Sequence, residues 1–145
     1  MARKKKSGSG QFDLIIRAKG TGSRILEIGQ GMMRFESTSK GPVKGKLYNG
    51  THWDTVETTM QPDGTAQFSV KLIHMTNKGE MLMGTGIGTQ LPADSKGIAK
   101  FTGDGTIWTP SPRLSKLNGS RWTCEGEYDM IKETVEVRVK FDTNP

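Results

Sequence analysis

Side chains that could move a proton lie among the apolar positions of the chain. His74 ends the apolar face of one alternating segment, and Tyr128 lies on an apolar face of another. Asp54 and Glu57 flank Val56, and a carboxyl group turned inward there would hold its proton more tightly and could act near neutral pH. His74, Glu57 and Tyr128 are therefore the candidate catalytic residues. The alternative is that His74 is a hydrogen-bonded core histidine and that Tyr128 packs its ring in the core.

Other large side chains could line a pocket in the same interior. The tryptophans could form an aromatic floor, the methionines suit an adaptable wall, and an arginine between Met33 and Phe35 could orient a carboxylate ligand. The alternative for the tryptophans and methionines is simple core filling. The predicted ligand-binding residues are Trp53, Trp108, Trp122, Arg34, Phe68 and Met83.

The sequence offers little for metal or cofactor chemistry. One cysteine, Cys124, excludes a Cys-based zinc site, and two histidines leave few ligands for a transition metal, so we expect no metal site. Burial would make the Cys124 thiol inert. The glycines between 84 and 88 lack dinucleotide-binding spacing, and the common hydrolase, phosphate-loop, zinc and calcium motifs are missing. We predict no cofactor.

The elements that must position these residues are β-strands. Apolar and polar residues alternate with a period of two over 11–19, 64–75, 122–130 and 134–141, as expected for strands with one buried face. Turn-forming pairs separate such segments at intervals of about 14 residues, which fits hairpins and leaves no room for crossover helices. Residues 81–88 suggest a bent or bulged strand. The expected turns are Asn49-Gly50, Asp63-Gly64, Asn77-Lys78-Gly79, Asp104-Gly105 and Asn118-Gly119.

Eight to ten antiparallel strands joined by hairpins predict an all-β fold, an eight-stranded up-and-down closed barrel. A sandwich would need long crossing connections, and few loops are long enough. The charges of the last hairpin also predict its register. A loop over 131–134 would pair Glu127 with Arg138 and Glu125 with Lys140, whereas a slip by two would set Glu127 opposite Glu136.

Charge divides the chain into a tail and a single domain. Of the 21 basic residues, four lie in residues 1–10, where there is no acidic residue, so 17 basic and 15 acidic residues remain in 11–145. We expect a flexible basic tail over 1–10 and one barrel domain over 11–145. The tail alone would support only weak nucleic-acid binding, so a nucleic-acid partner is not expected. No apolar run reaches the roughly 20 residues of a membrane span, and neither a secretory leader nor a disulfide is expected, which indicates a cytoplasmic protein.

Several turn motifs resemble known barrel families. The segments at 50–54, 61–66 and 76–80 resemble a bacterial family of small uncharacterised barrel proteins. Those at 101–105 (Phe-Thr-Gly-Asp-Gly), 113–119 (Arg-Leu-Ser-Lys-Leu-Asn-Gly) and 125–129 (Glu-Gly-Glu-Tyr-Asp) look like the closing strands of the allene oxide cyclase-like and dirigent-like barrels. The resemblance implies an eight-stranded barrel with a hydrophobic lumen that binds small hydrophobic or phenolic molecules without a cofactor, as a dimer or trimer. It transfers no catalytic residue, because no position matches.

Two functions remain open at this stage. The first is a barrel that binds a small hydrophobic molecule in its lumen and acts, if it is an enzyme, as a cofactor-independent isomerase or cyclase. The alternative is a non-enzymatic oligomeric structural or assembly protein that uses its outer faces as interfaces. Ile73 and Met75 on the outer face of their strand favour the alternative.

Overall fold

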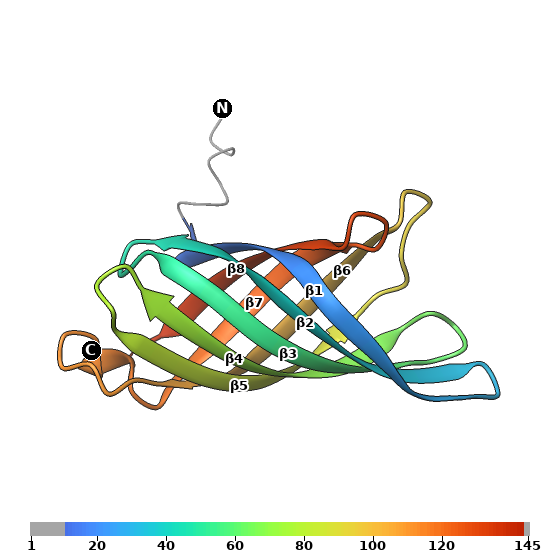
Figure 1. Ribbon diagram of the computed structural model, residues 1–145, viewed down its shortest axis with the longest axis horizontal. Helices are drawn as coiled ribbons and strands as arrows, with labels where there is room; N and C mark the ends of the chain where they lie inside the picture. Colours follow the sequence, from blue (N-terminus) through green and yellow to red (C-terminus); the bar gives the residue numbers. More distant parts are fainter. Residues whose placement is uncertain (1–10, 144–145) are drawn as a thin grey trace.

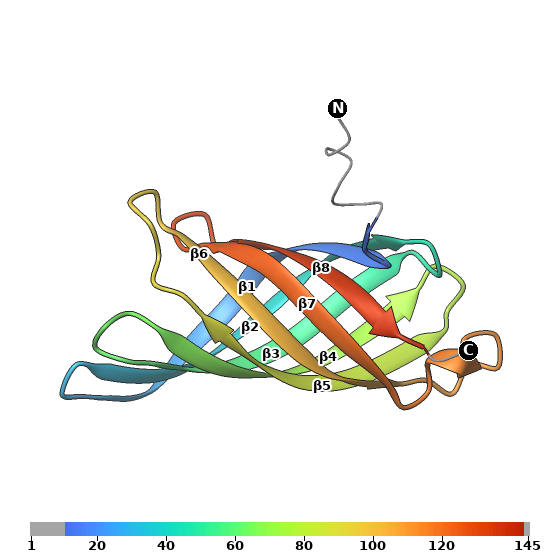
Figure 2. The ribbon, with the colours of Figure 1, turned by 180° about the vertical axis from the view of Figure 1, so that it is seen from behind.

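The computed structural model describes residues 11–143, which form a closed antiparallel barrel of eight strands in chain order (Figures 1 and 2). Pairing of β1 with β8, from Leu14↔Val139 to Lys19↔Thr134, closes the barrel. The predicted all-β, eight-stranded up-and-down barrel is confirmed. The strands are β1 (Leu14–Gly29), β2 (Met32–Gly45), β3 (Gly50–Met60), β4 (Ala66–Thr76), β5 (Met81–Gln90), β6 (Ile98–Trp108), β7 (Ser120–Asp129) and β8 (Thr134–Asp142), with one short 3-10 helix, η1 (Ser115–Leu117).

Glycines on the inner face let large rings enter the small barrel. Gly86 and Gly88 of β5 point inward, where a Cβ atom would collide with the rings of Trp122 and Phe68 respectively. The predicted bent strand over 81–88 is therefore an uninterrupted strand, and its glycines serve close packing. The register shifts of the sheet lie instead in β1.

One predicted turn is wrong. Asp104-Gly105 lies within β6, and the hairpin between β5 and β6 turns over 91–97. Gly105 is needed there because it pairs with Gly86 and a Cβ atom would meet the Trp122 ring and the neighbouring backbone. Asp63-Gly64, Asn77-Lys78-Gly79 and Asn118-Gly119 do fall between strands, and Gly64, Gly79 and Gly119 adopt the positive φ angles that turns require. Asn49 also lies between strands, but Gly50 is already the first residue of β3.

The predicted register of the last hairpin is also wrong. The strands pair Tyr128 with Val135, which sets Glu127 opposite Glu136, the slip by two that charge pairing disfavoured. Arg138 resolves the repulsion because its guanidinium bonds both carboxylates, at 2.5 Å to Glu127 and 2.9 Å to Glu136. The Asp129 carboxylate also caps the four-residue turn by accepting two backbone N–H bonds.

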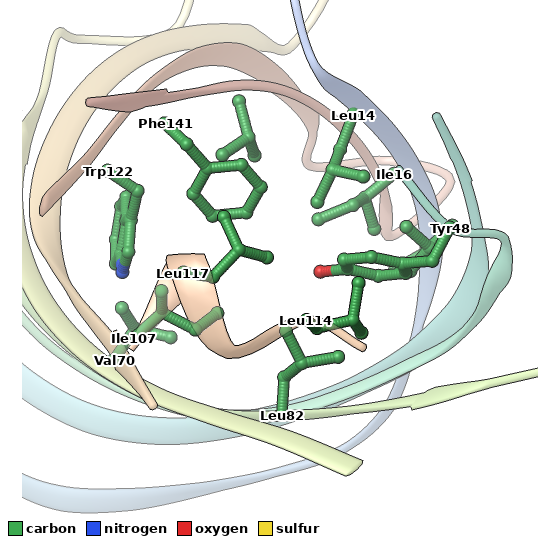
Figure 3. Packing of buried hydrophobic residues seen from close by; sticks show 13 residues of the cluster. Leu14, Ile16, Tyr48, Val70, Leu82, Ile107, Leu114, Leu117, Trp122 and Phe141 are labelled. Carbon is green, nitrogen blue, oxygen red and sulfur yellow. The ribbon is translucent and has the colours of Figure 1, made fainter. Parts of the chain in front are cut away.

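The barrel is filled at one end only. At that end the loop between β6 and β7 folds inward, and its Leu114 and Leu117 are buried against Leu14, Leu82 and Ile107 (Figure 3). Towards the other end, inward-facing residues remain partly accessible, which shows that the interior there is hollow. These residues include Val56, Phe68, Phe101, Val135 and Val137.

Within residues 11–143 there is no helix that is long and apolar enough to cross a membrane. The predicted basic tail over 1–10 lies outside the described residues.

Candidate functional site

A chain of hydrogen bonds between buried side chains runs from Tyr48 to Asp54. Antiparallel pairing places His52 of β3 directly opposite His74 of β4, and Asp54 follows two residues later on the same inner face. The Tyr48 hydroxyl lies 2.7 Å from His74 Nδ1, His74 Nε2 lies 2.9 Å from His52 Nδ1, and His52 Nε2 lies 2.6 Å from Asp54 Oδ2. Ser39 on β2 completes the array by donating its hydroxyl to Asp54 Oδ1 at 2.9 Å.

The three bonds in series have two self-consistent directions. In the first, Asp54 is a carboxylate and accepts from His52 Nε2–H, His52 Nδ1 accepts from His74 Nε2–H, and His74 Nδ1 accepts from the Tyr48 hydroxyl. In the second, Asp54 carries a proton and each bond is reversed, so that Tyr48 accepts from His74. Both directions keep both imidazoles neutral with every bond made. The bonds can also run outward from His52: as an imidazolium it donates to Asp54 and to His74 Nε2, while His74 Nδ1–H donates to Tyr48.

Burial keeps His74 and Tyr48, at the end of the array nearest the capping loop, uncharged. Desolvation and the neighbouring His52 lower the pKa of His74 to about 3, and desolvation raises the pKa of the Tyr48 hydroxyl well above its usual range. Figure 3 shows Tyr48 directing its hydroxyl into the barrel, above the capping loop that holds Leu114. Asp54 is the end of the array that reaches the hollow part of the barrel.

The hollow part is a cavity of about 300 Å³, at the lower end of the range for small-molecule sites. Its wall is mainly aliphatic and aromatic, and His52, Asp54 and His74 provide polar groups along one side. The cavity reaches exposed residues at the end of the barrel opposite η1, where Met130 and Glu133 line it. A ligand entering there would meet Asp54 on its way to the capped end.

Four of the residues predicted for the site do face the cavity. His74 and Phe68 lie on β4, and Trp122 and Tyr128 on β7. The indole N–H of Trp122 donates to the Thr106 carbonyl, so this ring offers only its apolar surface. Burial raises the pKa of the Tyr128 hydroxyl, and that of the Cys124 thiol to about 12, so the expectation of an inert cysteine fits its place in the wall.

The other five lie on the outer face of the barrel, which corrects the prediction that they line the interior. Glu57 is an odd number of residues from Asp54, so the alternation of β3 turns it outward, where Arg34 binds it at 3.0 Å. The same alternation places Arg34 outside because Met33 and Phe35 face inward. Trp53, Trp108 and Met83 are between 39% and 45% exposed and form a row with Ile73 across β3–β6.

His52, Tyr48 and Ser39 are the members of the array that sequence reasoning missed. A signal for His52 was present, since His52 and Asp54 are two residues apart and must share one face of a strand. Their partner His74 lies on the following strand, within reach of a hairpin pair. Tyr48 lies in the loop between β2 and β3, and no periodicity predicts where a loop side chain points.

Comparisons with known proteins show a shared fold. No protein-family model and no curated protein matches the sequence. Among solved structures, the chain is similar to a protein of unknown function from Clostridium acetobutylicum, with a TM-score of 0.76, 17% identity, and coverage of 90% of this chain and 97% of that one. It is also similar to a β-barrel-like protein from Acinetobacter baumannii, with a TM-score of 0.74, 13% identity, and coverage of 88% and 91%. A third similar structure is an enzyme from Penicillium herquei, with a TM-score of 0.60, 17% identity, and coverage of 90% and 93%. At these identities the likeness shows the barrel fold alone.

Proposed function

We propose that this protein binds a small, mainly apolar molecule in its barrel lumen and that Asp54 serves there as an acid–base group. The observation that carries the proposal is the position of Asp54: it lines the cavity, is held by His52 and Ser39, and is connected through His52 to two further buried groups. A carboxylate fixed in this way, beside an apolar wall that excludes water, is suited to proton transfer.

The chemistry proposed is a proton transfer that needs no cofactor. Asp54 accepts a proton from a weakly acidic O–H or C–H group of the ligand at a carboxylate position that His52 and Ser39 leave free, and both residues continue to donate to it. The proton then returns from Asp54 to a different atom of the same ligand. The net reaction is an isomerisation or a cyclisation, in which the lumen holds one conformation of the ligand.

His52, His74 and Tyr48 are positioning residues in this proposal. They hold Asp54 in place, and the ligand itself touches Asp54. Tyr128 lies nearer the open end, where its hydroxyl is placed to contact a ligand. A relationship to the allene oxide cyclase-like and dirigent-like barrels, and a cytoplasmic location suited to the lone Cys124, belong to the same proposal.

The experiment is to block the lumen and measure bound small molecules. Val137 of β8 faces the cavity, whereas Lys140 of the same strand faces outward and is exposed. Native mass spectrometry of the purified protein should show a co-purified or added apolar molecule on the wild type and on Lys140→Trp, and none on Val137→Trp. Equal occupancy of all three proteins would refute binding in the lumen.

A second candidate function is self-association through the outer face. Trp53, Ile73, Met83 and Trp108 are direct cross-strand neighbours on β3–β6, and they form an exposed apolar row without a charged member. An apolar row of this extent is typical of an interface, and we propose a second copy of this chain as its partner, in a dimer or trimer. Light scattering after size exclusion should give an oligomer for the wild type and for Thr85→Glu, and a monomer for Met83→Glu. A wild-type monomer at micromolar concentration would contradict the proposal.

A further inference from the structure

The cavity wall holds two acidic residues and neither lysine nor arginine. Among the described residues that line it, Asp54 and Glu133 are the acidic ones, and His52 and His74 are the basic ones. Arg138, on the neighbouring strand β8, points outward and is engaged by Glu127 and Glu136. We therefore expect the lumen to disfavour carboxylates and phosphates, which would meet Asp54 and Glu133 without a lysine or arginine partner.

Asp54 has room for a further hydrogen-bond donor. An ionised carboxylate accepts at about four positions, and His52 and Ser39 occupy two of them. The Asp54 side chain is 11% exposed, and that exposed part faces the cavity. In the first direction of the array both imidazoles are neutral, so Asp54 is then a buried carboxylate without a positively charged neighbour in the wall. Such a group attracts a cation more strongly than it would in water.

Aromatic rings surround the same space. Phe68 and Phe101 meet edge to face, with centroids 5.9 Å apart, and Trp122 and Tyr128 face the cavity from β7. The faces of these rings carry a negative partial charge and attract cations, particularly where water is excluded. A carboxylate within an aromatic wall is an arrangement suited to an organic cation.

We infer that the ligand of the lumen is a hydrophobic molecule carrying a positively charged nitrogen, whose N–H group binds Asp54. The inference rests on the proposed function, because it names the class of molecule that the lumen takes. It is consistent with the proposed chemistry, since a C–H group beside a cationic nitrogen is acidified and becomes a suitable proton donor to a carboxylate. Arg34 faces outward, where it binds Glu57, and therefore does not contact a ligand in the lumen.

Three probes of matched shape and different charge test the inference: 2-naphthylmethylamine, 2-naphthylmethanol and 2-naphthoate. Binding is measured at pH 7 by calorimetry, on protein from which co-purified small molecules have been removed. The amine should bind about tenfold or more tightly than the carboxylate, with the alcohol between them. Asp54→Asn should weaken the amine by about tenfold and leave the alcohol within about threefold, because it removes the charge and keeps the shape.

A second variant keeps the test decisive if Asp54→Asn fails to fold. Glu133→Gln, at the exposed mouth of the cavity, should weaken binding of the amine by a smaller factor than Asp54→Asn does, and it should leave the affinity for the alcohol unchanged. The class of ligand is wrong if 2-naphthoate binds as tightly as the amine, or if both variants leave the preference for the amine unchanged. The proposed function itself fails if no probe binds, or if Val137→Trp leaves the binding of every probe unaffected.

Discussion

Acid should destabilise this protein through His74, and the size of the effect follows from its burial. The fold holds His74 neutral, with a pKa of about 3, whereas the unfolded chain returns it to an ordinary value near 6.5. Between these two values the unfolded state binds one more proton than the native state. The contribution of His74 to the free energy of unfolding is therefore complete above about pH 6.5 and decreases as the pH falls towards 3.

The loss is large enough to measure. Each pH unit below 6.5 costs up to about 1.4 kcal/mol, so about 2–3 kcal/mol is lost between pH 8 and pH 4.5. The perturbation that isolates it is His74→Gln, which keeps a donor and an acceptor for Tyr48 and His52 but does not titrate. Urea unfolding of the wild type and the variant at several pH values gives the free energy of unfolding of each protein as a function of pH. The variant should be less stable at pH 8 and should lose about 2–3 kcal/mol less than the wild type by pH 4.5. Parallel pH profiles for the two proteins would show that His74 does not act in this way.

Further predictions concern packing and reactivity. Leu117→Ala should cost about 2–5 kcal/mol in chemical denaturation, because this fully buried side chain caps one end of the barrel; a change below about 1 kcal/mol would mean that the cap is not packed as described. Gly88→Val should prevent folding, seen as loss of the β-type circular dichroism, because its Cβ would collide with the Phe68 ring; a folded variant of normal stability would contradict this packing. Cys124 should react with a disulfide reagent far more slowly at pH 8 than a free thiol, since burial raises its pKa to about 12, and in denaturant the rates should become equal.

Strand alternation and turn residues were sufficient to predict the barrel, because each is a local property of the chain. The phase of a strand was harder to predict where both faces carry large side chains. In β3, Trp53 is exposed while His52 is buried, so apolar character alone pointed to the wrong face. Asp54 and Glu57 are three residues apart and must face opposite sides, and the prediction chose Glu57, the one that points outward.

Long-range pairing accounts for the remaining differences. The register of the last hairpin depends on Arg138 reaching diagonally to two glutamates, which a rule for directly opposite pairs does not include. The hydrogen-bonded array depends on His52 and His74 meeting across two strands and on Tyr48 entering from a loop. These contacts follow from how the barrel closes and not from any one segment of sequence.

A crystal structure of the protein with 2-naphthylmethylamine would show where the ligand binds. We expect the naphthyl ring to lie in the lumen among Phe68, Phe101 and Trp122, with the amine nitrogen within hydrogen-bonding distance of an Asp54 oxygen. Electron density for the amine only on the outer surface, together with a lumen that holds no ligand, would contradict this expectation.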